Sequence, residues 1–112
     1  MRALDEADFE SDVIQAEIPT IVAFTADWCA PCKWLTPVLE EVSTDAAGRV
    51  QVLLIDTDRS PELAARYRVA SLPTVVLIRA GKEVDRSLGV EPERLRAWVS
   101  SSGGVGPAPE VF

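Results

Sequence analysis

The sequence predicts a single α/β domain, with a central mixed β-sheet of four to five strands flanked by helices on both faces. Apolar runs typical of buried strands alternate with amphipathic stretches of helical period, and the last two strand runs flank a turn suited to an antiparallel hairpin. The chain has 112 residues, which leaves room for one domain only. Folding a chain of this mass can bury about two-thirds of its extended surface, which is enough for a hydrophobic core that needs no disulfides or metal ions.

The first half of the chain predicts a helix, a strand and a second helix. Asp5 is a candidate N-cap for a helix that includes Phe9 and Val13. The run 20–25 is apolar almost throughout, which predicts a central strand buried on both faces. An amphipathic helix is predicted from Pro31 onward, with a kink at Pro37. The apolar stripe of that helix consists of Leu35, Val38, Leu39 and Val42.

The second half predicts a strand, a short helix and a hairpin. Residues 50–55 form a second buried strand, and Ser60 and Pro61 open the short helix as its N-cap and first helical residue. The strand runs 75–78 and 83–88 are separated by a turn that contains glycine, which predicts an antiparallel hairpin.

The last helix and the end of the domain follow the hairpin. Pro92 opens a helix whose Leu95, Trp98 and Val99 share one face. Residues 101–112 are rich in glycine and proline and predict a flexible C-terminal tail, so the domain is expected to span 1–100.

Composition narrows the classes of function. The chain has 11 Lys and Arg against 18 Asp and Glu, and its net charge of -7 argues against nucleic acid or an anionic membrane as partner. Histidine is absent, which excludes Ser-His and Cys-His catalysis and zinc sites with His ligands. The N-terminus lacks a signal pattern, and no apolar run approaches the roughly 20 residues of a membrane span, so a cytoplasmic location is expected.

The two cysteines are the strongest local signal. Cys29 and Cys32 have a separation that random placement would produce in only about one arrangement in sixty. In a reducing compartment, such a pair is more typical of a chemical or metal-binding role than of a permanent disulfide. Cys29 falls where the strand 20–25 ends and a helix begins, and Cys32 falls in the first turn. The free backbone N–H groups and the helix dipole at that position favour the thiolate and lower the pKa of Cys29.

This placement supports a two-step exchange reaction. Cys29 attacks an external disulfide to form a mixed disulfide, and Cys32 then attacks Cys29 and releases the substrate in its reduced form. The residues alone leave two alternatives open: a structural disulfide, or two buried thiols without a role.

The residues around the cysteines resemble a known active site. The segment Asp27-Trp-Cys-Ala-Pro-Cys-Lys33 is similar to the motif Trp-Cys-Gly-Pro-Cys-Lys of the thioredoxin family. Pro37 stands where that family kinks the same helix, and Ser71-Leu-Pro-Thr74 is similar to the segment that carries its cis-proline. Gly81 and Gly89 occupy the positions of its hairpin and groove glycines.

The order and spacing of the elements match that family from Leu4 to about Val99, so the resemblance implies the thioredoxin fold. It also implies that Cys29 is the nucleophile and Cys32 the resolving cysteine of a redox-active disulfide, with no other cofactor and no metal. A cis peptide bond is implied before Pro73. The residues implied to line a groove for the substrate's extended backbone are Trp28, Ala30, Pro31, Leu72, Pro73, Gly89 and Val90.

Three departures from the family pattern affect the expected chemistry. The family's buried acid, which helps to deprotonate the resolving cysteine, corresponds to Ala23, and the lysine near it corresponds to Leu54. Without that pair no obvious buried base remains beside the dithiol, so resolution by Cys32 is expected to be slower than in a typical member. Ala30 replaces the glycine of the motif, and Thr25 stands where the family usually carries a second tryptophan.

The sequence predicts a monomeric, cytoplasmic protein-disulfide oxidoreductase that acts on proteins containing disulfides. The resemblance alone implies its partner, a reductase such as thioredoxin reductase. Two further hypotheses stay open: a binding or adaptor module with weak redox turnover, supported by the missing acid at Ala23, and two chains that pool four thiolates around a metal or iron–sulfur cluster.

Overall fold

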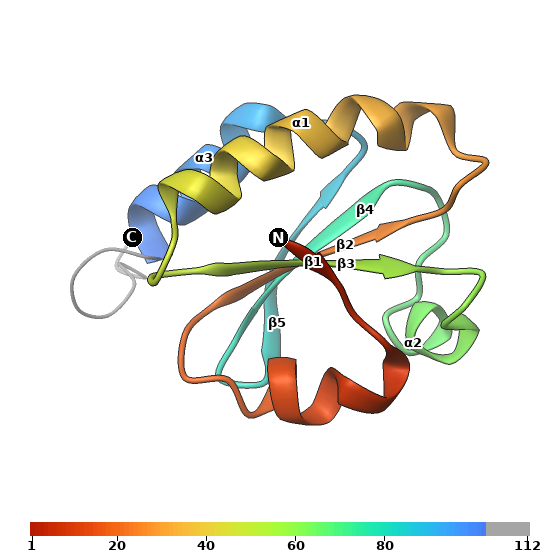
Figure 1. Cartoon of the computed structure of the whole chain (residues 1–112), viewed down its shortest axis with the longest axis horizontal. Coiled ribbons are helices and arrows are strands. Elements are labelled where there is room, and N and C mark those ends of the chain that lie inside the picture. Colours follow the sequence, from red (N-terminus) through yellow and green to blue (C-terminus); the bar gives the residue numbers. More distant parts are fainter. Residues whose placement is uncertain (103–112) are drawn as a thin grey trace.

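The computed structural model describes residues 1–102 and contains a five-stranded sheet with helices on both faces (Figure 1). The strands are β1 (Arg2–Ala3), β2 (Thr20–Thr25), β3 (Gln51–Asp56), β4 (Thr74–Arg79) and β5 (Lys82–Leu88). The helices are α1 (Ala30–Asp45), α2 (Pro61–Arg66) and α3 (Pro92–Ser102). The sheet order is β1-β3-β2-β4-β5, with β1 and β2 parallel to β3, and β4 antiparallel to both β2 and β5. The predicted mixed sheet is therefore confirmed.

The N-terminal part of the chain differs from the prediction. The edge strand β1 was not predicted, because two residues are too few to show a periodicity. The predicted first helix is a 3-10 turn at Glu6–Asp8 followed by a π-helical turn at Glu10–Ile14, and the side chain of Asp5 makes no capping hydrogen bond. The segment still buries Phe9 and Val13, the residues whose spacing indicated a helix.

The sheet separates two hydrophobic cores. On one face, α1 and α3 cover a core that includes Ile21 and Ala23 of β2; we call it the α1/α3 core. On the other face, the N-terminal turns and α2 cover a core that includes Val22 and Phe24 of β2; we call it the aromatic core, since Phe9 and Tyr67 also belong to it. Because β2 is covered on both faces, its sequence is apolar between the two threonines at its ends.

The predicted hairpin joins β4 and β5 through a two-residue turn. Ala80 and Gly81 both have positive φ, at 53° and 80°, as a type I′ turn requires. At Gly81 an added Cβ would lie 3.2 Å from the backbone oxygen of Ile14, so a larger residue would meet the N-terminal segment as well as an unfavourable φ.

The prolines of the three helices lie where the sequence predicts them, whereas the caps and the end of α3 differ in detail. Pro61 opens α2 as predicted, although Ser60, its N-cap residue, makes no side-chain capping bond. Pro37 lies inside α1, and Pro92 opens α3. α3 continues to Ser102, two residues beyond the expected domain end at 100, and residues 103–112 of the expected tail lie outside the described part of the chain.

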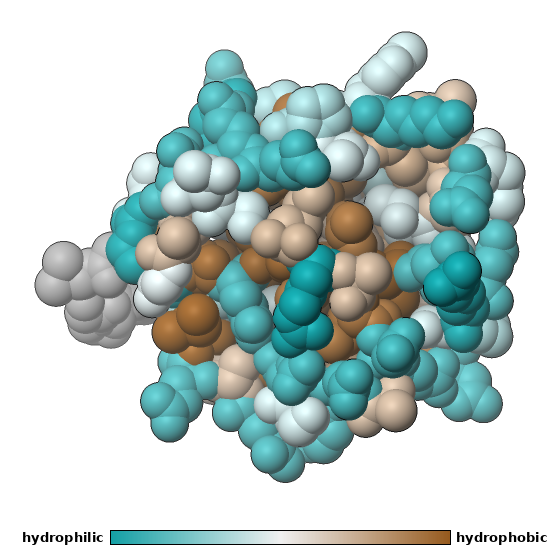
Figure 2. Space-filling view, viewed as in Figure 1, coloured by the Kyte–Doolittle hydropathy of each residue, from teal (hydrophilic) through white to brown (hydrophobic). Residues whose placement is uncertain are grey.

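The surface of the described part is mixed. In the view of Figure 1, hydrophobic residues are visible between hydrophilic ones near the sheet edge formed by β1 and β3 (Figure 2). None of the helices within residues 1–102 has both the length and the apolar character needed to cross a membrane.

Candidate active site

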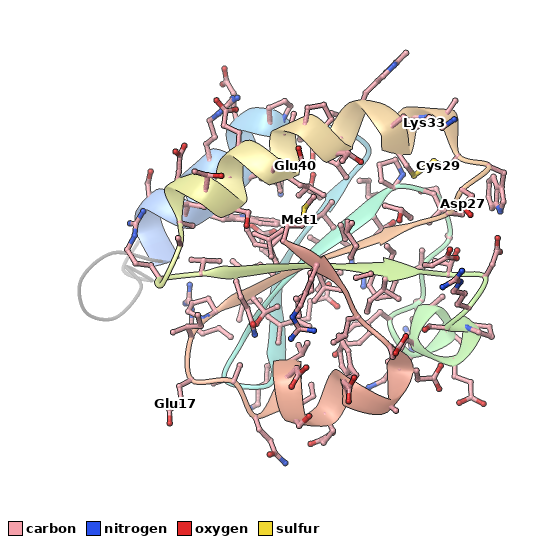
Figure 3. The ribbon with its side chains drawn as sticks, in the orientation of Figure 1. Met1, Glu17, Asp27, Cys29, Lys33 and Glu40 are labelled. Atoms are coloured by element: carbon pink, nitrogen blue, oxygen red, sulfur yellow. A yellow bond between two sulfur atoms is a disulfide. The ribbon has the colours of Figure 1, made fainter. Side chains whose placement is uncertain are left out.

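The two cysteines lie where β2 ends and α1 begins, as the sequence predicts. Cys29 is the N-cap residue of α1, and Cys32 lies in the first turn. They form a disulfide, with their Cα atoms 5.4 Å apart, at the end of the molecule where Asp27 and Lys33 also lie (Figure 3). Both cysteines are 4% exposed, so the disulfide is nearly covered by its surroundings.

The local backbone explains how this turn holds Cys29. The amide of Cys29 donates to the carbonyl oxygen of Ala26 at 3.1 Å, and its extended φ and ψ of -87° and 106° are those of an N-cap residue. Pro31 lies in the first turn, where a missing N–H leaves no helical hydrogen bond unmade. The amide of Cys32 donates to Cys29 Sγ at 3.2 Å. A negative charge on Cys29 Sγ would therefore meet both this amide and the positive end of the α1 dipole.

Trp28 lies beside the disulfide with 70% of its surface exposed. Its indole Nε1 donates to Asp58 Oδ2 at 2.9 Å, and Asp58 is in turn held by its own amide, which donates to Asp56 Oδ1 at 2.8 Å. Sequence reasoning missed Asp58. Parallel pairing of β2 and β3 brings the residues that follow the two strands together at one edge of the sheet, and this is the signal that could have found it.

The segment before β4 forms the other side of the disulfide. Leu72 packs against both cysteines and Ala26, and the Leu72–Pro73 peptide bond is cis, which confirms the implied geometry. The carbonyl oxygen of Pro73 accepts a hydrogen bond of 2.9 Å from the amide of Gly89, whose φ is +85°. This bond brings the two backbone segments of the expected groove side by side.

The other expected groove residues differ in exposure. Ala30 and Pro31 are exposed in the first turn of α1, whereas Val90 is half-buried against the α1/α3 core. Between Trp28 and Leu72 the surface is hollowed by a cavity of about 230 Å³, which we call the outer cavity. Its remaining lining residues are Thr57, Ala64, Val69, Ala70 and Ser71.

The two positions where the family carries its charged pair are neighbours in the sheet. Ala23 is fully buried and pairs with Leu54 across β2 and β3. Among the described residues, the buried polar side chains are Thr20, Ser60, Thr74 and Ser87, and no carboxyl group or amine is buried. The structure therefore contains no buried acid beside Cys32.

A second, smaller cavity of about 180 Å³, open to solvent, lies beside Cys32, and we call it the inner cavity. The loop after β2 contributes Ala26 and Asp27 to its lining, and β2 itself contributes Thr25. Its other lining residues, from α1, are Cys32, Lys33 and Thr36. The outer and inner cavities share no lining residue. The sequence alone did not indicate the inner cavity, because its shape depends on how α1 lies over the end of β2.

A disulfide between an N-cap cysteine and the third residue after it, at the junction of a buried strand and a helix and beside the exposed Trp28, defines a thiol–disulfide oxidoreductase. The family model for thioredoxin matches residues 1–101. The thioredoxin of Rickettsia bellii is 36% identical over 98 residues, covering 87% of this chain and 93% of the relative. That of Synechocystis sp. is 37% identical over 90 residues, covering 80% and 84%.

The similarity extends to a solved structure. The crystal structure of the Malassezia sympodialis thioredoxin superposes with a TM-score of 0.85 at 26% identity, covering 93% of this chain and 91% of that one. The chain belongs to the thioredoxin family and is a protein-disulfide oxidoreductase with the thioredoxin fold. Members of this family use their own dithiol and need no cofactor, and residues 1–102 hold no cluster of three or more His, Cys, Asp or Glu that could bind a metal ion.

Proposed function

We propose that this protein reduces disulfides in other proteins, with Cys29 as the nucleophile and Cys32 as the resolving cysteine. The observation that carries the proposal is the position of Cys29 at the N-cap of α1, where its Sγ accepts the amide hydrogen bond of Cys32. This environment stabilises negative charge on Cys29 more than on Cys32, so Cys29 is the group that attacks first.

The reaction proceeds by two exchanges of disulfide bonds. In the reduced protein, the thiolate of Cys29 attacks one sulfur of the substrate disulfide; the substrate S–S bond breaks, and its other sulfur leaves as a thiolate that takes a proton from water. Cys32 then loses its proton and attacks Cys29 Sγ. The bond between Cys29 and the substrate breaks, the second substrate sulfur leaves with the electron pair, and the protein is left with the Cys29–Cys32 disulfide.

The substrate would bind as an extended backbone across the residues around the disulfide. Trp28, Ala30 and Pro31 would contact it from the α1 side, and the backbone of Leu72 and Pro73 from the β4 side. Gly89 and Val90 would extend the groove, since Gly89 is hydrogen-bonded to Pro73. The exposed ring of Trp28 supplies apolar contact area at a small cost in conformational entropy.

Partners and location complete the proposal. A reducing cytoplasm would supply electrons through a reductase such as thioredoxin reductase, which regenerates the dithiol after each cycle. The protein would act as a monomer, since each step uses the two cysteines of one chain. The bacterial relatives named above, which are thioredoxins, support this assignment.

Reduction of insulin disulfides with dithiothreitol as electron donor tests the proposal. We expect the wild-type protein to accelerate precipitation of the insulin chains, and Cys29→Ser to lose this effect because the first attack is impossible. In the absence of dithiothreitol, reduced Cys32→Ser should attack insulin but not resolve, so it should accumulate as a mixed disulfide with insulin, visible as a mass shift. A wild-type rate no greater than that of Cys29→Ser would overturn the proposal in favour of an adaptor role.

A further inference from the structure

The inner cavity reaches only one of the two cysteines. Its lining includes Cys32 and does not include Cys29, and it lies apart from the outer cavity between Trp28 and Leu72. Thr25 forms its wall on the sheet. Because side chains alternate along a strand, Thr25 lies on the same face of β2 as Ala23, the face that α1 covers.

The resolving step requires a proton acceptor at Cys32. A thiol is a poor nucleophile, so Cys32 must become a thiolate before it attacks. Ala23, at the position where the family carries its buried acid, is fully buried, and no carboxyl group or amine of the described residues is buried. Among the described residues, a buried acid or amine is therefore not available to take the proton of Cys32.

The inner cavity has room for water instead. The cavity's volume of about 180 Å³ exceeds that of a single water molecule, which occupies about 30 Å³ in the liquid. Its lining combines the hydroxyl groups of Thr25 and Thr36 with the charged groups of Asp27 and Lys33, so water in it would have polar partners. A bulkier side chain at position 25 would occupy this space.

We propose that Thr25 keeps open a water-filled proton exit for Cys32, and that this exit takes the place of a buried acid. The inference rests on the proposed roles of Cys29 and Cys32. In the resolving step, the proton of Cys32 passes to water in the inner cavity and from there to solvent. The thiolate attacks Cys29 Sγ, the new S–S bond forms, and the substrate sulfur leaves with the electron pair. Thr25 is a positioning residue, since it acts through the water.

Charged side chains of both signs surround the inner cavity. Asp27 and Lys33 line the inner cavity and are both exposed. Asp27 also borders a neighbouring cavity, whose other charged residues are Asp5, Glu6, Asp56 and Arg59. Lys33 would favour the thiolate of Cys32 and the carboxylates, which outnumber the cations, would oppose it, so these charges do not by themselves promote loss of the Cys32 proton.

Stopped-flow oxidation of the reduced protein by dithiobis(nitrobenzoate) separates the two steps. The first phase releases one thionitrobenzoate as Cys29 attacks, and the second phase releases another as Cys32 resolves the mixed disulfide. We expect Thr25→Trp to slow the second phase by about tenfold near neutral pH, because the indole fills the cavity, while the first phase stays close to wild type. Thr44→Trp, the same exchange at an exposed position of α1, should leave both phases close to wild type.

Two further variants separate the effect of filling the inner cavity from the effect of removing the hydroxyl group of Thr25. Thr36→Leu fills the same cavity from α1 and should also slow the second phase. Thr25→Val keeps the shape of the side chain but removes the hydroxyl, and it should retain most of the second-phase rate. If Thr25→Val loses as much rate as Thr25→Trp, the hydroxyl itself acts and the water exit is wrong.

The double variant with Ala23→Asp tests the exit most directly. An acid at position 23 offers Cys32 a second acceptor, so Thr25→Trp should slow the second phase much less in the Ala23→Asp background than in the wild type. An equal slowing in both backgrounds would overturn the proposal, as would an unchanged second phase in both Thr25→Trp and Thr36→Leu. Loss of the first phase in the wild-type protein would instead contradict the proposed function.

Discussion

The two faces of the sheet differ in what their side chains do. The aromatic core packs Phe9, Phe24 and Tyr67 together, with the Tyr67 ring centroid 5.7 Å from that of Phe9 and 5.9 Å from that of Phe24. The α1/α3 core is aliphatic apart from Trp98, and the inner cavity and the disulfide lie near the end of β2. Three packed rings maximise buried area in the aromatic core, while the small side chains of Ala23 and Thr25 on the opposite face of β2 leave room beside Cys32.

This difference indicates that stability and chemistry are largely assigned to opposite faces. The cysteines belong to the start of α1, which covers the α1/α3 core, and no aromatic side chain of the opposite core belongs to the cluster that they form with Ala26. Leu72 connects the aromatic core to the active site, because it packs against both the aromatic core and the cluster that contains the cysteines. Substitutions on the two faces should therefore separate loss of folding from loss of redox chemistry.

The largest effect should come from Phe24→Ala, which leaves a cavity at a fully buried position of the aromatic core. We expect the free energy of unfolding to fall by about 4 kcal/mol. Urea denaturation measures this loss, and the two phases of oxidation by dithiobis(nitrobenzoate), measured below the unfolding transition, should stay close to wild type. Slowing of either phase by tenfold or more, which is about 1.4 kcal/mol of activation free energy, would show that the faces are coupled.

A smaller change in stability should accompany Ala23→Asp on the opposite face. The carboxyl group would be buried with little polar contact, so we expect a loss of about 2 kcal/mol in urea denaturation. The second oxidation phase should nevertheless become several-fold faster, since Cys32 gains an acceptor for its proton. Ala23→Asn provides the matched control, because it adds a polar group of the same shape that cannot accept the proton. Equal second phases in the two variants would contradict a role for the acid.

The smallest effect should appear only in alkaline solution. Burial raises the pKa of Tyr67 above its ordinary value of 10.0, although the nearby Arg66 lowers it in part. The folded protein thus holds this proton more tightly than the unfolded chain, so the contribution of Tyr67 to stability is complete below pH 10 and is lost as the pH rises through the raised pKa. Tyr67→Phe does not ionise, so its stability should fall less steeply above pH 10 in urea denaturation.

Because Tyr67 is the only tyrosine in the chain, its ionisation can be followed directly by ultraviolet absorbance. If the wild-type protein and Tyr67→Phe lose stability with the same slope in that range, the aromatic core does not exclude water from the phenol group as the structure indicates.

Local patterns were sufficient for most of the fold. The apolar run of β2, the proline that opens α3 and the glycine-containing turn between β4 and β5 depend on neighbouring residues, and each was found where it was predicted. Pattern reasoning failed where the outcome depends on distant packing. The spacing of Phe9 and Val13 indicates one buried face, but 3-10 and π-helical turns bury the same two side chains as an α-helix would.

The site shows the same division. The positions of Cys29 and Cys32 follow from a strand followed by a helix, so they could be placed from the sequence. The hydrogen bond from Trp28 to Asp58 joins residues thirty positions apart, and it exists only because β2 and β3 are paired. The inner cavity depends in addition on side-chain volumes, since Thr25 and Thr36 come from different elements and leave space between them.

The two edges of the sheet bear on how the protein meets other chains. One edge is the two-residue β1, and the other is β5, whose exposed residues include Lys82, Glu83 and Asp85. A short strand offers few free backbone groups, and charged side chains on an edge oppose the addition of a further strand. The described part of the chain is thus poorly suited to edge-to-edge pairing with extended segments of unfolded proteins, which a reductant of disulfides would encounter often.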